Sequence, residues 1–358
     1  MASMLDYLAW RGDLPFAWVP VSDVDELIFS TLAYVSFDNI VPTQIGAAVT
    51  LASAASIILS AEKPETLVRT RQDLELLRVL ADCPRYRDIH LTNYRNILIP
   101  QEETQFAAIT FLLPSGQAVL AFRGTDNTLV GWREDFNMTF RDQIPAQLLA
   151  LEYTTAFAAA YSDAFRLLGH SKGGNLAVYA AAKAPPAVQK RILEVCNHDG
   201  PGFSQAMMAD AGYQAILPKV RTYAPQSSVF GMLLEHQEEY TIVKSNQVGL
   251  LQHDPYTWEV LGPEFVTLKQ RTDDSLFLDS TFRTWLAGMS LEQRDLFFDA
   301  VFDLLETGGV QSAREILRPQ NIVNYLKALH ADGAKRDLIG GELLNLLQSA
   351  KNVFTDVP

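Results

Sequence analysis

The chain has 358 residues, of which 48% are hydrophobic and 20% are charged, and its formal net charge at pH 7 is −13. A chain of this size buries a large core and forms one large domain with an appendage, or two domains. The excess of acidic residues argues against nucleic acid or an anionic membrane surface as the main partner. The two cysteines, Cys83 and Cys196, give no disulfide framework, and the apolar run around Cys196 indicates a buried thiol.

Residues 20–90 are predicted to be helical. Residues 24–34 and 66–80 carry apolar side chains at intervals of three and four residues. Residues 45–61 contain no charge, yet they are short for a membrane span and rich in Ala, Ser and Thr, so a packed internal helix is expected. Residues 1–6 lack a basic segment followed by an apolar one. We therefore expect no secretory signal, no integral membrane segment and a cytoplasmic protein.

From residue 106 the pattern changes to short apolar runs. Residues 106–113 and 117–122, separated by Pro114-Ser115-Gly116, predict a β-hairpin. Further strands are predicted at 165–168, 192–197, 220–224 and 240–243, and helices between them at 146–160, 175–184 and 203–211. Strands that alternate with helices indicate an α/β fold, with a largely parallel sheet covered by helices on both faces.

The strand pattern ends at about residue 265. Residues 280–286, 291–305 and 322–329 are amphipathic, with Gly308-Gly309 and Gly340-Gly341 as the expected breaks between helices. The predicted organisation is therefore an α/β domain over residues 1–265, including the N-terminal helices, and a helical C-terminal region over residues 266–358.

The most informative segment is Gly169-His170-Ser171-Lys172-Gly173, which has the form Gly-X-Ser-X-Gly. An apolar run precedes it and a helix-compatible run follows, so it predicts a strand, a sharp turn and a helix. Such a turn places the serine hydroxyl above the N-terminus of the helix, where backbone N–H groups favour developing negative charge. We interpret Ser171 as a nucleophile; the alternative is a structural glycine-rich turn.

A serine nucleophile needs a base, and the base needs an orienting acid, on loops that follow later strands. His253 follows the last strand of the predicted sheet and is the predicted base; the alternative is a loop or capping histidine. His236 lies in a charged stretch typical of a solvated surface histidine, and His330 lies in the helical tail. Asp199 follows the strand at 192–197 and is the predicted acid; the alternative is an aspartate that caps the next helix.

The third requirement is a pair of donors that hold the oxyanion of the tetrahedral intermediate. One is expected to be the backbone N–H of Lys172, directly after the nucleophile. The other is expected from Thr125, which follows a strand and Gly124 and offers its N–H and its hydroxyl. The alternative for this second segment is an ordinary loop at a strand end.

The segments Phe122-Arg123-Gly124-Thr125 and Gly169-His170-Ser171 with Gly173-Gly174 resemble the two signature segments of the class-3 lipases. More closely, nearly the whole chain resembles an uncharacterised bacterial family of lipase-like α/β hydrolases. That resemblance rests on residues 25–34, 105–108, 123–126, 131–138, 169–175, 199–203, 252–254 and Trp258. It implies an α/β-hydrolase fold and a serine-hydrolase site.

Two positions depart from the lipase pattern. Class-3 lipases usually place an apolar residue after the serine, and here Lys172 stands there, so a carboxylate partner is expected from Glu134, Asp135 or Asp199. Those lipases usually carry their acid after the strand that corresponds to residues 220–224, and no carboxylate follows that strand here. Asp199 is thus inferred from its position and by elimination.

In lipases the segment after the first oxyanion donor forms a lid, and residues 127–141 occupy that place here. Its apolar side chains either cover an acyl-binding groove or pack onto the core; they are Trp132, Phe136, Met138 and Phe140.

The favoured function is hydrolysis of a small-molecule or lipid ester through a Ser171 acyl-enzyme, without a metal or organic cofactor. One alternative is a non-catalytic hydrolase-fold module that binds a protein or lipid; a thioesterase or peptidase with the same three residues is another. A metal site built from His198, Asp199, His253 and Asp254 is the remaining alternative. No helical His-X-X-X-His pairing supports it. His198 also fits a hydrogen-bonding wall residue.

Overall fold

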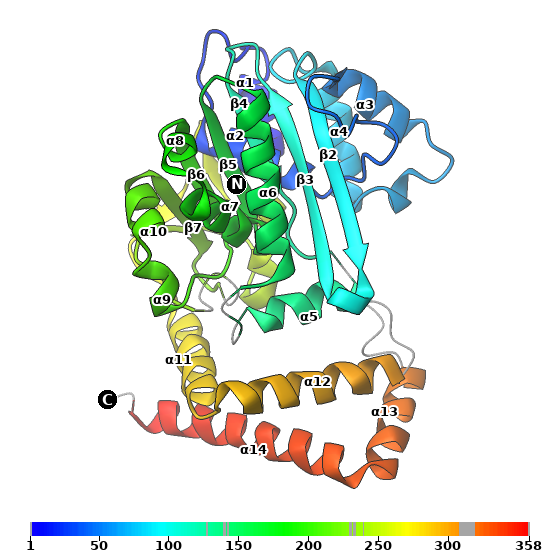
Figure 1. Cartoon of the computed structure of the whole chain (residues 1–358), viewed down its shortest axis with the longest axis vertical. Helices are drawn as coiled ribbons and strands as arrows, with labels where there is room; N and C mark the ends of the chain where they lie inside the picture. Colours follow the sequence, from blue (N-terminus) through cyan, green and yellow to red (C-terminus); the bar gives the residue numbers. More distant parts are fainter. Residues whose placement is uncertain are drawn as a thin grey trace. The chain divides into compact units, whose positions relative to one another are not determined.

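The computed structural model describes residues 2–126, 128–138, 141, 143–228, 231, 234–238, 240–307 and 319–356 (Figure 1). The chain forms two compact units. The sheet unit comprises Met1–Leu98, Phe106–Gly124 and Pro145–Arg271, and the helical unit comprises Ile99–Gln105, Thr125–Ile144 and Thr272–Pro358. The division predicted from the sequence, 1–265 and 266–358, remains a prediction.

In the described part of the chain, nine strands form one sheet whose spatial order follows the sequence. They are β1 (Val49–Thr50), β2 (His90–Ile99), β3 (Thr104–Leu112), β4 (Ala118–Phe122), β5 (Phe165–His170), β6 (Ile192–His198), β7 (Val220–Pro225), β8 (Tyr240–Val243) and β11 (Thr267–Leu268). Strands β4 to β8 are parallel, whereas β3 pairs with β4, and β11 with β8, in antiparallel fashion. The predicted α/β class is therefore confirmed.

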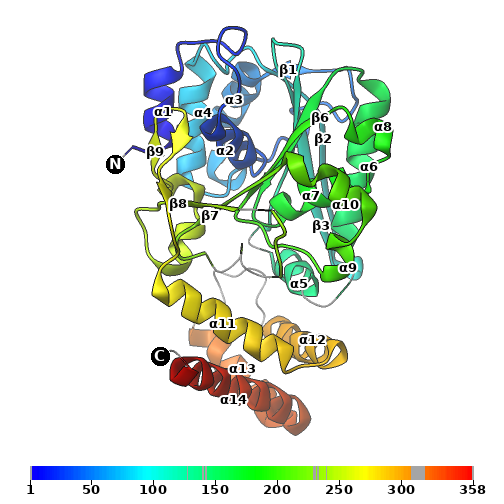
Figure 2. The ribbon, with the colours of Figure 1, turned by 90° about the vertical axis from the view of Figure 1, so that its left-hand side faces the viewer.

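Helices cover both faces of this sheet (Figure 2). The helices of the sheet unit are α1 (Met4–Arg11), α2 (Asp23–Leu32), α3 (Leu51–Leu59), α4 (Arg71–Asp82), α6 (Pro145–Ala160), α7 (Lys172–Lys183), α8 (Pro186–Gln189), α9 (Gln205–Met208) and α10 (Ala211–Ile216). On one face, α1 to α4 share a core with Phe111 and Leu168. On the other face, Phe157 of α6 packs edge-on against Phe165 of β5, with ring centroids 5.8 Å apart. This alternation along β5 is what a strand buried on both faces requires.

The N-terminal helices are joined by a buried charge network. Ser22 begins α2 with a capping box, in which its side chain and that of Asp25 bond reciprocally to the helix backbone. The carboxylate of Asp25 also accepts hydrogen bonds from Tyr7, Tyr86 and Arg85, and its ion pair with Arg85 is fully buried. The network fixes the start of α2 against the loop after α4.

The helical unit contains α5 (Leu129–Asn137), α11 (Asp273–Ala287), α12 (Leu291–Thr307), α13 (Pro319–Ala331) and α14 (Gly333–Asp356). Its core is largely aromatic: Phe136 of α5 lies against Phe298 of α12, with ring centroids 4.5 Å apart. Arg133 on α5 forms ion pairs with Glu103 and with Asp299. Helix α5 thus shares a core with the C-terminal helices.

Most predicted elements of the sheet are confirmed. The hairpin pairs Ala108 with Phe122 and Leu112 with Ala118, and the four later strands appear with ends shifted by at most two residues. Strand β1 was not predicted because residues 20–90 were interpreted as helical, and β2 was not predicted because no element was assigned to residues 91–105.

Other predictions were wrong in part. The helix expected at 203–211 is two short helices, α9 and α10, since Ala209 and Asp210 interrupt it. Gly340-Gly341 does not break a helix but lies inside α14, and strand structure continues to Leu268. Gly308-Gly309 lies outside the described residues. Within 45–61, only Leu51–Leu59 is helical, and none of the described helices is long and apolar enough to cross a membrane.

Candidate active site

Ser171 lies in a sharp turn between β5 and α7. Its backbone angles, φ 58° and ψ −135°, are unfavourable for a residue with a Cβ atom, so the surrounding fold must hold it there. A Cβ atom on Gly169 would lie 2.3 Å from the backbone of Gly173, and one on Gly173 would lie 2.1 Å from the carbonyl oxygen of Phe122. The predicted order of strand, turn and helix is confirmed, and both glycines are required by close backbone contact.

Asp199 directly follows β6, the strand next to β5. Its backbone N–H donates to the carbonyl of Tyr223 at 2.7 Å, and the N–H of Ser171 donates to the carbonyl of His198 at 2.8 Å. Serine and aspartate therefore follow neighbouring parallel strands at the same edge of the sheet. Asp199 is fully buried and, like Ser171, has a positive φ, of 56°.

His253 ends the short 3₁₀-helix η5 (Gly249–His253), after strand β8. Its Nδ1 lies 2.6 Å from Oδ2 of Asp199. The carboxylate accepts this hydrogen bond from Nδ1–H, which leaves Nε2 as the ring nitrogen that can act as a base. The other oxygen of Asp199 accepts the hydroxyl of Ser228. Both oxygens of the predicted acid are thus engaged, one of them by the predicted base.

His170 links the serine turn to the His253 loop. It precedes Ser171 in the chain, and its ring centroid lies 4.5 Å from that of His253. Its Nε2 lies 2.7 Å from the backbone carbonyl oxygen of His253. The structure therefore brings the segments that carry Ser171, Asp199 and His253 together in the sheet unit.

The predicted oxyanion donors lie in different units. Lys172 is the first residue of α7 and is buried, in the sheet unit. Gly124 also belongs to the sheet unit, and a Cβ atom on it would lie 2.9 Å from Cβ of Ser171. Thr125 follows Gly124 in the chain and belongs to the helical unit, where its hydroxyl donates to the carboxylate of Asp135. Because that hydroxyl proton is engaged, only the N–H of Thr125 remains as a candidate donor.

The other histidines have structural partners. The prediction that His236 is a solvated surface residue was wrong. Its side chain is buried, and it forms hydrogen bonds with Glu238 at 3.0 Å and with the carbonyl of Gly231 at 2.7 Å. The charged stretch around it was misleading because its side chain turns inward.

His198 is a buried wall residue between Ser30 and Cys196, and burial lowers its pKa to about 3. A histidine that stays neutral and bonds two side chains fits the role of a hydrogen-bonding wall residue better than that of a metal ligand. Asp254 pairs with Arg69, at 3.2 Å. The four residues considered for a metal site therefore have separate partners, apart from the contact between Asp199 and His253.

The segment 127–141, which occupies the place of the lipase lid, contains helix α5. Its Trp132 and Phe136 are partly buried against the aromatic core of the helical unit, and Met138 is buried. Asn127 and Phe140 lie outside the described residues. Trp132 and Phe136 therefore pack onto a core, which is one of the two alternatives considered for this segment. That core belongs to the C-terminal helices.

Sequence reasoning missed Tyr34 and Ser228. The hydroxyl of Tyr34 bonds Nδ1 of His170 at 2.9 Å, and Ser228 bonds Asp199. Tyr34 belongs to a segment that carried the family resemblance. That resemblance indicated that the segment matters but did not indicate what Tyr34 does. Ser228 follows a strand at which only carboxylates were sought.

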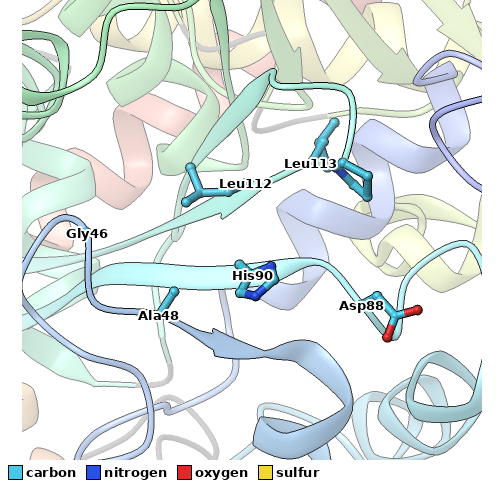
Figure 3. A pocket seen from close by; sticks show the side chains of 7 residues that line it. Gly46, Ala48, Asp88, His90, Leu112 and Leu113 are labelled. Carbon is cyan, nitrogen blue, oxygen red and sulfur yellow. The ribbon is translucent and has the colours of Figure 1, made fainter.

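Figure 3 shows a separate pocket from close by. It has a volume of about 500 Å³ and is lined by Gly46, Ala48, Asp88, His90, Leu112, Leu113 and Pro114. Leu112 pairs with Ala118 at the start of β4, whereas Ser171 follows the far end of β5. This pocket is therefore distinct from the candidate active site.

Comparison with known proteins identifies one family. The family model described as Mbeg1-like matches residues 80–303, which is more than half of the chain and includes Ser171, Asp199 and His253. No curated protein matches the chain.

Proposed function

The chain belongs to the Mbeg1-like family, a lipase-like family, and we propose that it is a serine hydrolase that cleaves carboxylic esters. The observation that carries this proposal is the hydrogen bond of 2.6 Å between Asp199 and His253, beside the strand end that carries Ser171. A buried carboxylate bonded to an imidazole, on a loop next to the strand end that carries a serine in a strained turn, is an arrangement suited to acyl transfer. A relation to class-3 lipases belongs to the same proposal.

In the proposed reaction, the Ser171 hydroxyl attacks the ester carbonyl while Nε2 of His253 removes its proton. The buried carboxylate of Asp199 keeps the ring in the useful tautomer and stabilises the imidazolium that forms. His253 then protonates the leaving alkoxide, and an acyl-enzyme remains on Ser171. Water, deprotonated by His253, attacks the acyl carbonyl. His253 then returns this proton to Oγ of Ser171 as the bond to the acyl group breaks, which releases the acid and restores the hydroxyl.

The developing oxyanion would be held by backbone donors. We assign the first to the N–H of Lys172, because it begins α7, and the positive end of the helix dipole lies there. The second is the N–H of Thr125, which follows Gly124 next to Ser171. Removal of one such donor costs about a hundredfold to a thousandfold in kcat.

The proposed substrate is a small-molecule or lipid ester, such as an acyl ester or lysolipid. The proposed site needs no metal or organic cofactor, since its nucleophile, base and oxyanion donors all come from the chain. We also propose a cytoplasmic location. Esters, thioesters and amides share this acyl-transfer chemistry, so the leaving group must be determined with substrates.

A fluorophosphonate probe tests the proposal, because it labels only serines that a neighbouring base activates. We expect labelling of the wild type and none of Ser171→Ala. Ser115→Ala, in the exposed turn between β3 and β4, is the matched control and should be labelled like the wild type. p-Nitrophenyl esters of increasing chain length then give the acyl preference. Wild-type protein that takes up no probe and cleaves no ester would favour a non-catalytic binding module.

A further inference from the structure

We propose that His170 is a positioning residue, which holds the main chain of His253 so that the imidazole of His253 faces Ser171. This inference rests on the proposed function and adds a second contact that holds the catalytic histidine in place. Asp199 holds the ring of His253, and His170 holds its backbone. Neither Ser171 nor the substrate needs to touch His170 for this role.

The hydrogen bonds of His170 define its protonation. Its Nε2 lies 2.7 Å from the carbonyl oxygen of His253, and a carbonyl oxygen only accepts, so Nε2 carries the proton. Nδ1 of the neutral ring is then an acceptor, and the hydroxyl of Tyr34, 2.9 Å away, donates to it. One tautomer satisfies both partners.

The surroundings keep this ring neutral. His170 is fully buried, and burial, followed by the neighbouring charge of His253, lowers the pKa of His170 well below its usual value of 6.5. A neutral ring adds no second positive charge beside the imidazolium that His253 becomes during the reaction. His170 can therefore stay in place through the catalytic cycle.

The same loop is held from two further directions. The indole N–H of Trp258 donates to the carbonyl of Gln252 at 2.9 Å, and Asp254 pairs with Arg69 at 3.2 Å. The guanidinium of Arg69 also lies over the ring of Tyr34, 4.6 Å from its centroid. The residues before and after His253 are thus tied down, and His170 supplies the contact at His253 itself.

The geometry explains why Asp199 alone is insufficient. A hydrogen bond to Nδ1 fixes one ring atom, but Nε2 still moves if the main chain of His253 shifts. A displacement of about 1 Å at a reacting group costs about a hundredfold in rate. The hydrogen bond from His170 to the backbone carbonyl of His253 restricts this movement, because His170 is the residue next to Ser171.

The test compares His170→Phe, which removes the donor, with His170→Gln, whose side-chain amide can donate from the place of Nε2. We expect kcat for a p-nitrophenyl ester to fall about a hundredfold in His170→Phe, with KM unchanged. His170→Gln should recover most of that loss. A merely structural role would not produce this split between kcat and KM or the rescue by glutamine.

A second readout is independent of activity. The proton on Nδ1 of His253, bonded to Asp199, gives a low-field signal in proton NMR, which Ser171→Ala should retain. We expect the signal to broaden or vanish in His170→Phe and to persist in His170→Gln. If His170→Phe does not fold, Tyr34→Phe removes the hydroxyl that orients the ring and should produce smaller changes of the same sign.

The two proposals fail in different ways. Absence of Ser171-dependent labelling in the wild type contradicts the proposal that the protein is a serine hydrolase. The low-field NMR signal in the His170 variants still tests whether His170 positions His253. Wild-type protein that is labelled, together with His170→Phe that keeps both the wild-type kcat and the low-field signal, overturns the positioning role alone.

Discussion

Nδ1 of His253 and Oδ2 of Asp199 lie 2.6 Å apart, although 54 positions separate the two residues in the chain. The aspartate is fully buried, and its backbone N–H is held by the neighbouring strand at Tyr223. A buried carboxylate acts in a medium of low dielectric, where its effect on a neighbouring charge is much larger than in water. The contact is therefore suited to stabilise an imidazolium.

Asp199→Asn tests this contact. Asparagine has nearly the same shape, but its amide NH₂ favours the wrong tautomer of His253. The charge that would stabilise the imidazolium is lost as well. We expect kcat for ester hydrolysis to fall by about a factor of 10⁴ while the fold persists. The rate of fluorophosphonate labelling should fall in parallel.

Asp254→Asn is the matched control, because this neighbouring carboxylate pairs with Arg69 and not with the ring of His253. It should retain activity within about tenfold of the wild type, since one partly exposed ion pair contributes about 1 kcal/mol or less. Equal losses in both variants would show that Asp199 has no special role.

The candidate site was predictable to the extent that it depends on local sequence and on strand order. Ser171 has a local signature, because a tight turn requires glycine at Gly169 and Gly173. Asp199 and His253 follow from topology, since parallel strands bring the residues after them to one edge. The contact between Tyr34 and His170 was not predictable, because it joins residues 136 positions apart and no local pattern signals it.

The fold shows the same limit. Gly340-Gly341 was predicted to break a helix, yet both residues lie inside α14, because neighbouring helix-forming residues outweigh the cost of two glycines. His236 was predicted to be solvated from its charged neighbours, yet its side chain is buried on Glu238, which accepts hydrogen bonds from Thr222 and Tyr213. Single residues in a local pattern are therefore weaker signals than the whole element or the packing around them.

Gly173, which lies in close backbone contact, and Gly340, which lies in an open part of a helix, should respond differently to substitution by alanine. Gly173→Ala places a Cβ atom 2.1 Å from the carbonyl oxygen of Phe122, and a backbone atom cannot move away cheaply. We expect a loss of several kcal/mol in unfolding free energy, or no soluble protein. A Cβ atom on Gly340 meets nothing within 4 Å, so Gly340→Ala should stabilise the helix by up to about 1 kcal/mol.

Urea unfolding measures both glycine variants against the wild type. Near-wild-type stability of Gly173→Ala would mean that the serine turn is looser than the structure shows. Destabilisation by Gly340→Ala would mean that α14 is not helical at this point.

The buried ion pair at the start of α2 should matter more than an exposed one. Arg85→Leu leaves the carboxylate of Asp25 buried without its counter-ion, and we expect a loss of about 3–5 kcal/mol in unfolding free energy. Arg87→Leu removes the partner of Asp88, and both side chains of that pair are more than half exposed. It should change stability by less than about 1 kcal/mol. Urea unfolding of both variants decides, and similar small losses would contradict a rigid network.

Stability should fall in mild acid because of His198. Burial lowers the pKa of His198 to about 3, whereas the residue titrates near 6.5 in an unfolded chain, so the unfolded state binds the extra proton. The stabilisation is therefore complete above pH 6.5 and is lost as the pH falls toward 3. Each pH unit in this window removes about 1.4 kcal/mol from the wild type relative to His198→Gln.

Urea unfolding at several pH values between 7 and 4 measures that difference directly. Other buried groups titrate in both proteins, so subtraction of the two curves isolates His198. His330→Gln, which changes an exposed histidine of α13, should run parallel to the wild type. Parallel curves for His198→Gln as well would mean that His198 is protonated in the folded protein and that its bonds to Ser30 and Cys196 do not require a neutral ring.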